Sequence, residues 1–326
     1  MAPVVLTRAL TVQFGATTAL DAVDVEIGGG VTGLVGANGA GKTTLFSTLL
    51  GLLRPTSGAV SVLGLEPRRN GRELRASVGY GSERNVFPDD LRAYDFVRHM
   101  AEVRGLPRRE ARNRASDALW LVGLGEERFR PLGTMSTGQR QRVKLAQAVA
   151  ADPSLMLLDE PTDGLDPVQR DEMLGLIRTI SEEFSIDVVL SSHVLEEVER
   201  VCDAVVVLDA GRLVTSGRLT DLAARQSGLV VELVDVPDRP GTAEAVAALM
   251  RARGLAVETV GGLLTVASDD DAALDAVRDA VAEAGARLRS LGGRHRRLED
   301  VFTQPDPEPA LDAEAPTGPP RDPMPT

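Results

Sequence analysis

A glycine-rich stretch near the N-terminus has the residue types needed to bind a chain of phosphates. Residues 36–44 read Gly-Ala-Asn-Gly-Ala-Gly-Lys-Thr-Thr, which matches the pattern G-x-x-x-x-G-K-[ST]. In this pattern backbone N–H groups surround the phosphates, the lysine contacts the β- and γ-phosphates, and the Thr43 hydroxyl binds Mg²⁺. The predicted nucleotide ligands are Gly36, Ala37, Asn38, Gly39, Ala40, Gly41, Lys42, Thr43 and Thr44.

The lysine of this stretch stands out against the composition. Only two of the 36 basic residues are lysines, and one of them is Lys42. The guanidinium of arginine is planar and bulkier than an ammonium group, so it cannot act as the same compact point charge. We therefore infer that the site requires an ammonium group at this position.

Further polar residues follow at the ends of apolar runs. Asp159 and Glu160 come directly after the apolar residues 155–158, and His193 follows the run 188–192. At a strand tip Asp159 can hold Mg²⁺, while Glu160 can orient or deprotonate an attacking water. His193 can hydrogen-bond a γ-phosphate and that water. Phosphoryl transfer to water needs these parts, so the set favours hydrolysis of a nucleoside triphosphate.

Ser136 and Gly138 precede a predicted helix at residues 140–150, and a hydroxyl and an N–H at a helix N-terminus suit a γ-phosphate. Taken alone, each of these stretches has an ordinary structural explanation. An Asp-Glu pair after a strand is commonly a turn, Ser136 is commonly an N-cap, and a single histidine is commonly structural. It is their joint occurrence, in this order, that favours catalysis.

The elements that must position these residues indicate an α/β sheet domain over residues 1–222. A buried strand is predicted at 31–35 and a helix at 44–50, on either side of the phosphate-binding stretch. Short strands are predicted earlier, at residues 4–6, 11–14 and 23–27. The arginine-rich helical segments 91–104 and 109–121 predict a helical subdomain over about residues 87–145.

A change of pattern after Gly228 predicts a second, smaller domain at residues 229–303. Its order of elements is βαββαβ, which resembles a ferredoxin-like α+β unit. Residues 304–326 contain eight of the 19 prolines and are acidic, so we expect a disordered tail.

The composition excludes several classes of partner. A net charge of −12 argues against nucleic acid and against direct adhesion to anionic lipid. The N-terminus has no secretory signal pattern, and no apolar run is long enough to cross a membrane. The single cysteine, Cys202, lies in an apolar stretch and is expected to be a buried, inert thiol. We therefore expect a soluble, cytosolic protein.

With these motifs in order, residues 1 to about 303 resemble the ATP-binding subunits of ABC transporters, in particular the export type with an extra C-terminal α/β domain. The resemblance implies a P-loop NTPase fold and identifies residues 36–44 as Walker A, 155–160 as Walker B, 135–139 as the signature and 162–166 as the D-loop. It implies ATP and Mg²⁺ as cofactors and Lys42, Glu160 and His193 as catalytic residues. Further ATP contacts are implied at Phe14, Ser136, Gly138 and Gln139. Implied Mg²⁺ ligands are Thr43, Asp159 and Glu83.

Two positions depart from the family pattern. The signature is usually Leu-Ser-Gly-Gly-Gln, whereas residues 135–139 read Met-Ser-Thr-Gly-Gln. Glu83 stands where the family usually has the glutamine of the Q-loop. A carboxylate can ligate Mg²⁺, but it adds negative charge beside the phosphates, so a solvated loop glutamate is the alternative. Phe14 is either the adenine-stacking ring of the family or an ordinary core residue.

The resemblance also implies partners. Two ATPase domains of this family meet head to tail, so we expect a homodimer, with a heterodimer as the alternative. A separate transmembrane permease is expected to bind near residues 87–94 and to hold the protein on the cytoplasmic face of the membrane. Membrane contact through the permease alone, no nucleic acid, and export of drugs, antibiotics or lipid-like molecules are implied. The alternatives are a soluble ABC ATPase acting on ribosomes or DNA, and a different phosphate-loop enzyme such as a small-molecule kinase.

Overall fold

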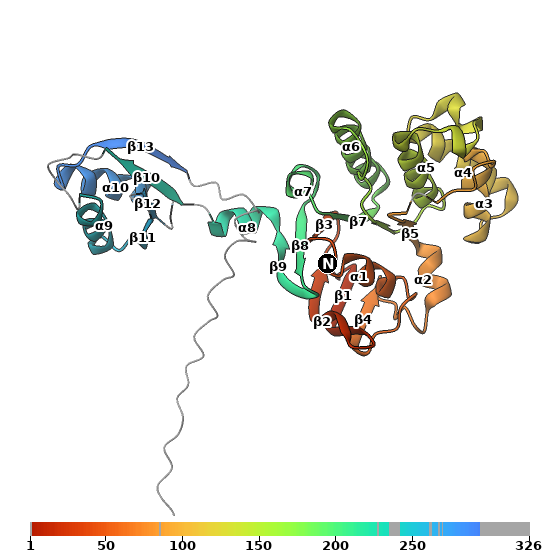
Figure 1. The fold of residues 1–326 in the computed structure, drawn as a ribbon, viewed down its shortest axis with the longest axis horizontal. Coiled ribbons are helices and arrows are strands. Elements are labelled where there is room, and N and C mark those ends of the chain that lie inside the picture. The colour runs from red at the N-terminus through yellow and green to blue at the C-terminus, as the bar shows by residue number, and fades with distance from the viewer. Residues whose placement is uncertain are drawn as a thin grey trace, which may run out of the picture.

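A six-stranded sheet forms the centre of the larger part of the molecule (Figure 1). The computed structural model describes residues 2–84, 86–226, 228–234, 242–260, 263–266, 268 and 270–293. The strand order is β5-β6-β7-β3-β8-β9, and all neighbours are parallel except β8 and β9. The strands are β3 (Val31–Val35), β5 (Val78–Gly81), β6 (Leu155–Leu158), β7 (Asp187–Ser192), β8 (Ala204–Asp209) and β9 (Arg212–Arg218). Every residue of β3 and β6 is buried, as expected for strands covered on both faces.

A second, antiparallel sheet has the order β2-β1-β4. Its strands are β1 (Val5–Phe14), β2 (Thr17–Ile27) and β4 (Ser57–Val62). The sequence predicted two short strands where the structure has the single strand β1. The pairing register of β1 with β4 shifts between Arg8 and Thr11, and Ala9 has a φ of 43°. This irregularity breaks the alternation of buried and exposed residues, which is why the pattern looked like two strands.

Eight helices in the described part of residues 1–226 accompany these sheets. They are α1 (Lys42–Leu49), α2 (Gly71–Ser77), α3 (Ala93–Val103), α4 (Arg108–Leu121), α5 (Thr137–Val149), α6 (Pro167–Phe184), α7 (Leu195–Val201) and α8 (Leu219–Gln226). Two short 3₁₀ turns, at Gly125–Phe129 and Leu132–Thr134, lie between α4 and α5. Helices α3, α4 and α5 form a group at one side of the parallel sheet (Figure 1), where the helical insertion was predicted.

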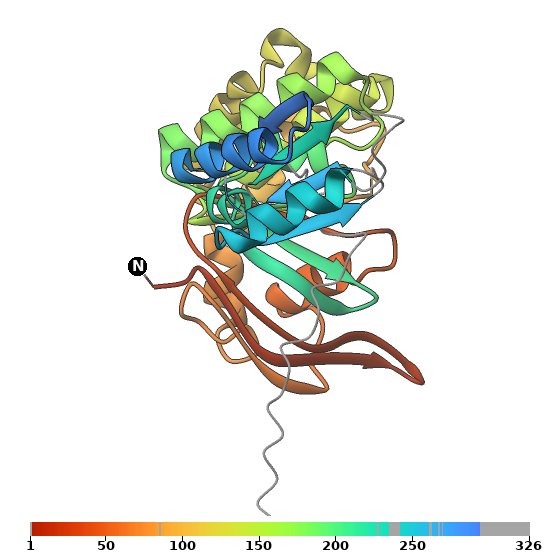
Figure 2. The same cartoon turned by 90° about the vertical axis from the view of Figure 1, so that its left-hand side faces the viewer.

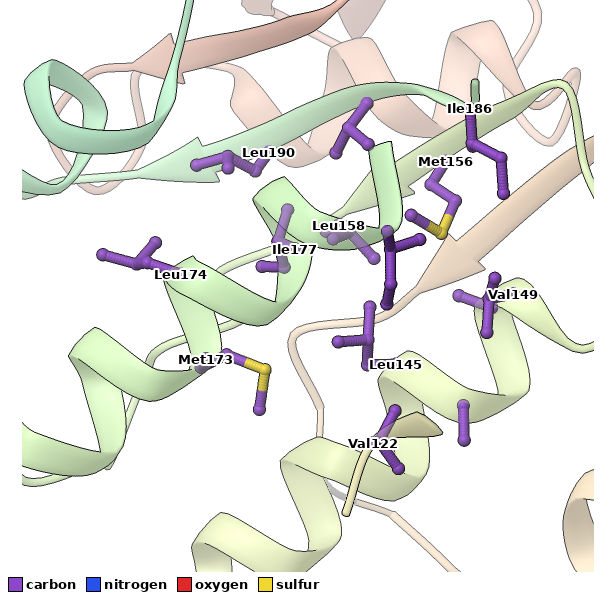
Figure 3. Close-up of a cluster of buried hydrophobic side chains, with 14 of the residues drawn as sticks. Val122, Leu145, Val149, Met156, Leu158, Met173, Leu174, Ile177, Ile186 and Leu190 are labelled. Atoms are coloured by element: carbon purple, nitrogen blue, oxygen red, sulfur yellow. The ribbon is translucent and has the colours of Figure 1, made fainter. Parts of the chain in front are cut away.

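Two hydrophobic clusters hold these layers together. Helix α1 contributes Leu45, Phe46 and Leu49 to one cluster, which it shares with both sheets. The other cluster joins α5 and α6 to the opposite face of the parallel sheet. Figure 3 shows Leu145 of α5 and Ile177 of α6 beside residues of β6. The segments that follow β3 and β6 are therefore held in place by buried side chains on both faces of the sheet.

A carboxylate directly before β8 links this strand to β3 and α6. Asp203 accepts a hydrogen bond from the N–H of Val31 at 2.9 Å and one from Nη1 of Arg178 on α6 at 2.8 Å. Burial acts to raise the pKa of Asp203, but the hydrogen bonds from Val31 and Arg178 outweigh it and hold this pKa below the ordinary value of 3.8. The ionised form therefore stabilises the fold.

We predict that Asp203→Asn lowers the free energy of unfolding by about 1 kcal/mol at pH 7, a figure that allows for solvent screening because the two side chains are 37% and 34% exposed. Because the folded-state pKa is depressed, the contribution is complete above pH 3.8 and is lost as the pH falls through the folded-state pKa. Urea unfolding of parent and variant at pH 7, 5 and 3 measures the difference. A difference that is unchanged at pH 3 would show that the charge of Asp203 is not its cause.

After α8 the chain forms a smaller unit, which faces the viewer in Figure 2. Its elements are β10 (Leu229–Leu233), α9 (Thr242–Ala252), β11 (Val257–Val260), β12 (Leu263–Val266), α10 (Asp271–Glu283) and β13 (Leu288–Gly293). The strands form an antiparallel sheet in the order β11-β12-β10-β13. Buried residues of both helices, such as Val246 and Val277, share one cluster with Val231 of β10. The predicted end of this domain at residue 303 and the predicted tail 304–326 lie outside the described residues.

In the described part of the chain, no helix is both long enough and apolar enough to cross a bilayer.

Cys202 is buried, and burial raises the pKa of its thiol. The thiol therefore stays protonated, and the reactive thiolate does not form.

Candidate functional site

The phosphate-binding stretch lies between the end of β3 and the start of α1. Gly41 precedes the helix with a φ of 104°, and a Cβ atom there would lie 2.8 Å from the carbonyl oxygen of Ala19. Gly36 is equally restricted, because its Cβ atom would lie 2.4 Å from the carbonyl oxygen of Leu208. No side chain among the described residues caps helix α1, so its first N–H groups are left to bind an anion. The local fold therefore requires glycine at both positions and presents backbone donors.

Lys42 is the first residue of α1, and its side chain is almost fully buried. Its Nζ atom donates a hydrogen bond to the carbonyl oxygen of Gly36 at 2.6 Å and lies 3.1 Å from Oε1 of Glu160. The ammonium group is thus held between the phosphate-binding stretch and the carboxylate that follows β6.

One cavity of about 250 Å³ brings most of the predicted site residues together. It includes the residues predicted to bind Mg²⁺ and most of the phosphate-binding stretch. The lining residues are Ala19, Ala37, Asn38, Gly39, Gly41, Lys42, Thr43, Thr44, Glu83, Asp159 and Glu160. Ala19, on β2, was not predicted. Gly36 and Ala40 shape the loop without lining the cavity, and Phe14, Ser136, Gly138, Gln139 and His193 are not among the lining residues either.

Asp159 is oriented by a hydroxyl that the sequence did not reveal. Ser191 of β7 donates to Oδ1 of Asp159 at 2.7 Å and accepts a hydrogen bond from the N–H of Glu160 at 2.9 Å. Oδ2 of Asp159 is buried and has no hydrogen-bond partner among the described residues. Burial is the main influence that raises the pKa of Asp159, while the hydroxyls of Ser191 and Thr43 act against it. A cation beside Oδ2 would compensate this burial.

Glu160 contacts the other two residues predicted to be catalytic, Lys42 and His193. Its Oε1 atom lies beside Lys42, and its Oε2 atom lies 2.9 Å from Nδ1 of His193. The backbone of Glu160 has a φ of 46°, a left-handed conformation that costs energy in a residue other than glycine. Half of the His193 side chain is exposed, whereas the Glu160 side chain is buried. The carboxylate is thus fixed and the imidazole has room to turn.

The signature residues form the start of α5. Ser136 is the N-cap of this helix: its Oγ atom accepts from the N–H of Gln139 at 3.2 Å, and Oε1 of Gln139 accepts from the N–H of Ser136 at 3.1 Å. The side-chain amide of Gln139 also donates to Glu127. The ordinary N-cap explanation therefore holds for Ser136, but its hydroxyl proton remains able to donate to a phosphate. The polar atoms of the Gln139 side chain are engaged within the fold.

Two further predicted contact residues, Phe14 and Glu83, are exposed. Phe14 ends β1 with half of its surface exposed, so it is not an ordinary core residue. The Glu83 side chain is exposed and lines the cavity.

A second lysine near the site was not predicted. Lys144 of α5 is buried, and its Nζ atom donates to the carbonyl oxygens of Ser82 at 2.7 Å and Glu83 at 3.1 Å. Burial lowers the pKa of Lys144 to about 8, although nearby carboxylates, first among them Asp163, act to raise it. The composition could have drawn attention to Lys144, because it is the other of the two lysines in the chain.

In the described part of the chain, no group of three or more His, Cys, Asp or Glu side chains is arranged to hold a metal. A Mg²⁺ site of the phosphate-binding kind does not need one, since it uses one or two carboxylates together with phosphate oxygens and water. The unpaired Oδ2 of Asp159, near the Thr43 hydroxyl and Glu83, fits that donor set.

Comparison with known proteins finds a matching family model and several relatives. Residues 20–163 match the family model described as ABC transporter. A daunorubicin resistance ATP-binding protein, DrrA3 of Streptomyces coeruleorubidus, is 32% identical over 293 residues, which cover 89% of this chain and 92% of that protein. A methionine import ATP-binding protein, MetN of Nocardia farcinica, is 33% identical over 292 residues, covering 87% and 85%. Both alignments are longer than the predicted ATPase domain.

A solved structure shows the same fold. CbiO1 of Clostridium perfringens, part of the ABC transporter complex cbiONQ, has a TM-score of 0.62 and 30% identity. The match covers 68% of this chain and 91% of that one.

Proposed function

The chain belongs to the ATP-binding subunits of ABC transporters, and from this premise we propose that two copies hydrolyse ATP at shared sites to drive export through a separate membrane permease. ATP binding and hydrolysis are the activities of this family. The dimer, the roles of single residues, the metal and the direction of transport are the parts that we propose.

One observation carries the proposal of a dimer. The cavity that collects Lys42, Asp159 and Glu160 is not lined by Ser136 or Gly138. The sequence holds one phosphate-binding stretch and one signature. If the signature binds a γ-phosphate, a second copy must supply it, and the arrangement that satisfies both copies equally is a two-fold dimer.

Within each site we propose a division of roles. The N–H groups of the loop and Lys42 bind the phosphates, because both present positive charge at the start of α1. Glu160 orients the attacking water and accepts its proton, and His193 contacts the γ-phosphate from beside Glu160. The exposed ring of Phe14 offers a face for adenine.

Thr43, Asp159 and Glu83 would hold Mg²⁺, since all three line one cavity and Asp159 has an unpaired buried oxygen. When bound, the metal neutralises charge on the β- and γ-phosphates. Lys144 donates hydrogen bonds to the carbonyl oxygens of Ser82 and Glu83, and these two bonds fix the position of Glu83 beside the metal site.

This arrangement predicts an effect of Lys144 on the metal. Lys144→Met keeps an unbranched side chain but removes the hydrogen bonds to Ser82 and Glu83. Since a hydrogen bond from a charged donor contributes about 1.5 kcal/mol or more, we expect the Mg²⁺ concentration for half-maximal ATPase activity to rise about 10-fold. ATP binding without Mg²⁺ should not change. A Mg²⁺ titration of ATPase activity measures this, and an unaltered requirement for Mg²⁺ would contradict the role given to Lys144.

The direction and cargo of transport are proposed from the relatives. The name of DrrA3 refers to drug resistance, whereas that of MetN refers to import of methionine. We propose export of drugs, antibiotics or lipid-like molecules, with the protein held at the cytoplasmic face by its permease. The relatives described above give no support to action on ribosomes or DNA.

The permease contact is proposed at residues 87–94, between β5 and the first turn of α3. Asp89 and Asp90 are exposed there, while the backbone of Asp89 is anchored by a hydrogen bond from the N–H of Gly133. We predict that the triple charge reversal Asp89→Lys, Asp90→Lys and Arg92→Glu lowers transport in membrane vesicles at least about 10-fold, because complementary charges fix docking. ATPase activity of the isolated protein should stay within about twofold. Loss of nucleotide binding in this variant would refute the assignment.

A further inference from the structure

Glu197 is a buried carboxylate close to the site to which the proposed chemistry gives no role. It lies on α7, and the residue is 4% exposed. Its Oε2 atom accepts hydrogen bonds from the hydroxyl of Thr162 at 2.9 Å and from that of Ser192 at 2.7 Å. Its Oε1 atom lies 3.1 Å from Nε of Arg170. A buried charge is tolerated only where it is paired and hydrogen-bonded, so these contacts are required and not incidental.

The three partners of Glu197 belong to three different segments. Thr162 is in the loop that follows Glu160 and leads into α6. Ser192 is the last residue of β7 and directly precedes His193. Arg170 is in the first turns of α6. One carboxylate therefore fixes the loop after Glu160 to the segment that carries His193, and both to α6.

The same loop also touches the start of the signature helix. Nε2 of Gln141 on α5 donates to the carbonyl oxygen of Asp163 at 2.9 Å. A Cβ atom on Gly164 would lie 3.2 Å from Cγ2 of Thr137, so the loop packs closely against α5. In the proposed dimer the signature serves the ATP bound mainly by the other copy, whereas Glu160 and His193 serve the ATP bound by their own copy. The loop 162–166 thus lies between parts that belong to different sites.

We propose that Glu197 is a positioning residue that sets the spacing of Glu160 and His193 and couples the two ATP sites of the dimer through the loop 162–166. Nδ1 of His193 lies 2.9 Å from Oε2 of Glu160. His193 follows Ser192, and Glu160 precedes the loop that contains Thr162, so both catalytic residues adjoin segments that are bound to Glu197. A movement of α5 reaches the loop through Gln141, and Glu197 passes it to Ser192 and so to His193. Glu197 itself touches no substrate. This inference rests on the proposed ATPase dimer and adds to it the residue that links its two sites.

Two substitutions at Glu197 separate positioning from folding. Glu197→Ala removes every contact, and we expect the turnover number for ATP to fall about 100-fold, because small displacements of catalytic groups have effects of this size. In Glu197→Gln one amide oxygen can still accept from both hydroxyls, so we expect partial rescue, with a turnover number between those of Glu197→Ala and the parent. Glu196→Ala removes an exposed neighbouring carboxylate of the same helix and should behave as the parent.

The decisive readout is cooperativity in the full-length protein. The ATP dependence of hydrolysis should give a Hill coefficient above 1 for the parent and for Glu196→Ala, and a value near 1 for Glu197→Ala. ATP affinity by equilibrium binding should change less than about threefold, because Glu197 does not touch the nucleotide. A structural defect alone would lower the melting temperature and the active fraction without changing the Hill coefficient. If Glu197→Ala does not fold, Thr162→Val and Ser192→Ala each remove one bond and must show the same loss of cooperativity.

The outcomes distinguish this inference from the proposed function. A parent protein without ATPase activity would overturn both. An active, cooperative parent together with a folded Glu197→Ala that keeps its turnover number and Hill coefficient would overturn the role of Glu197 alone.

Discussion

Replacing Glu160 with glutamine is expected to lower the turnover number for ATP hydrolysis by about 100- to 1,000-fold, the size of effect that a positioned general base has. The amide keeps the shape of the side chain, and its oxygen can occupy the position of Oε1, which lies 3.1 Å from Nζ of Lys42. It cannot accept a proton from water. Release of phosphate under single-turnover conditions measures hydrolysis, and equilibrium binding of labelled ATP measures affinity.

ATP affinity of the Glu160→Gln protein should remain within about threefold of the parent, because the phosphate-binding loop is intact. Glu196→Gln, an exposed carboxylate on α7, is the matched control and should hydrolyse ATP normally. A Glu160→Gln protein with an ordinary turnover number would show that another group activates the water, and the assignment of Glu160 would then be wrong.

Replacing Lys42 with alanine is expected to weaken ATP binding by about 30- to 1,000-fold, the loss typical when one partner of a buried charge pair is truncated. The side chain is 7% exposed and its ammonium group lies at the phosphate-binding loop. Its removal also leaves Glu160 without its cationic neighbour, which adds negative charge close to the phosphates. Isothermal titration with Mg-ATP gives the affinity directly.

Lys42→Arg tests whether charge alone is needed. It keeps the positive charge, but its planar guanidinium does not fit the space within hydrogen-bond reach of the Gly36 carbonyl oxygen. We expect this variant to bind ATP almost as poorly as Lys42→Ala. An arginine variant with parental affinity would contradict the inference, drawn from the rarity of lysine in the sequence, that the site needs an ammonium group.

The parts of the fold that the sequence revealed are those set by local patterns. The strand at 31–35 was predicted at its observed bounds because it is a continuous apolar run before a glycine-rich loop. The helix predicted at 140–150 begins three residues earlier, at Thr137, because Ser136 and Gln139 form a capping box. The bulge at Ala9 is set by pairing with two neighbouring strands, so no local pattern could predict it.

The sequence revealed those residues of the candidate site that belong to a motif. It did not reveal the residues that act through tertiary contacts. The residues of the phosphate-binding stretch follow from spacing alone. Ser191 and Glu197 act through side chains that meet only after distant segments pack, with partners 32 and 35 residues away. Serine and glutamate in those segments are unremarkable by type. Lys144 is an intermediate case: the sequence shows that lysine is rare in this chain, but it does not show which groups Lys144 contacts.

The mass of the Glu160→Gln protein in the presence of Mg-ATP tests the central proposal most directly. Without hydrolysis the ATP-bound form should accumulate, so light scattering at saturating Mg-ATP should give twice the mass of the single chain, and the single-chain mass without nucleotide. Adding Ser136→Arg to the same protein should abolish the doubling, because the signature would no longer contact the partner's ATP. A Glu160→Gln protein that binds Mg-ATP and keeps the mass of one chain would contradict the shared-site account.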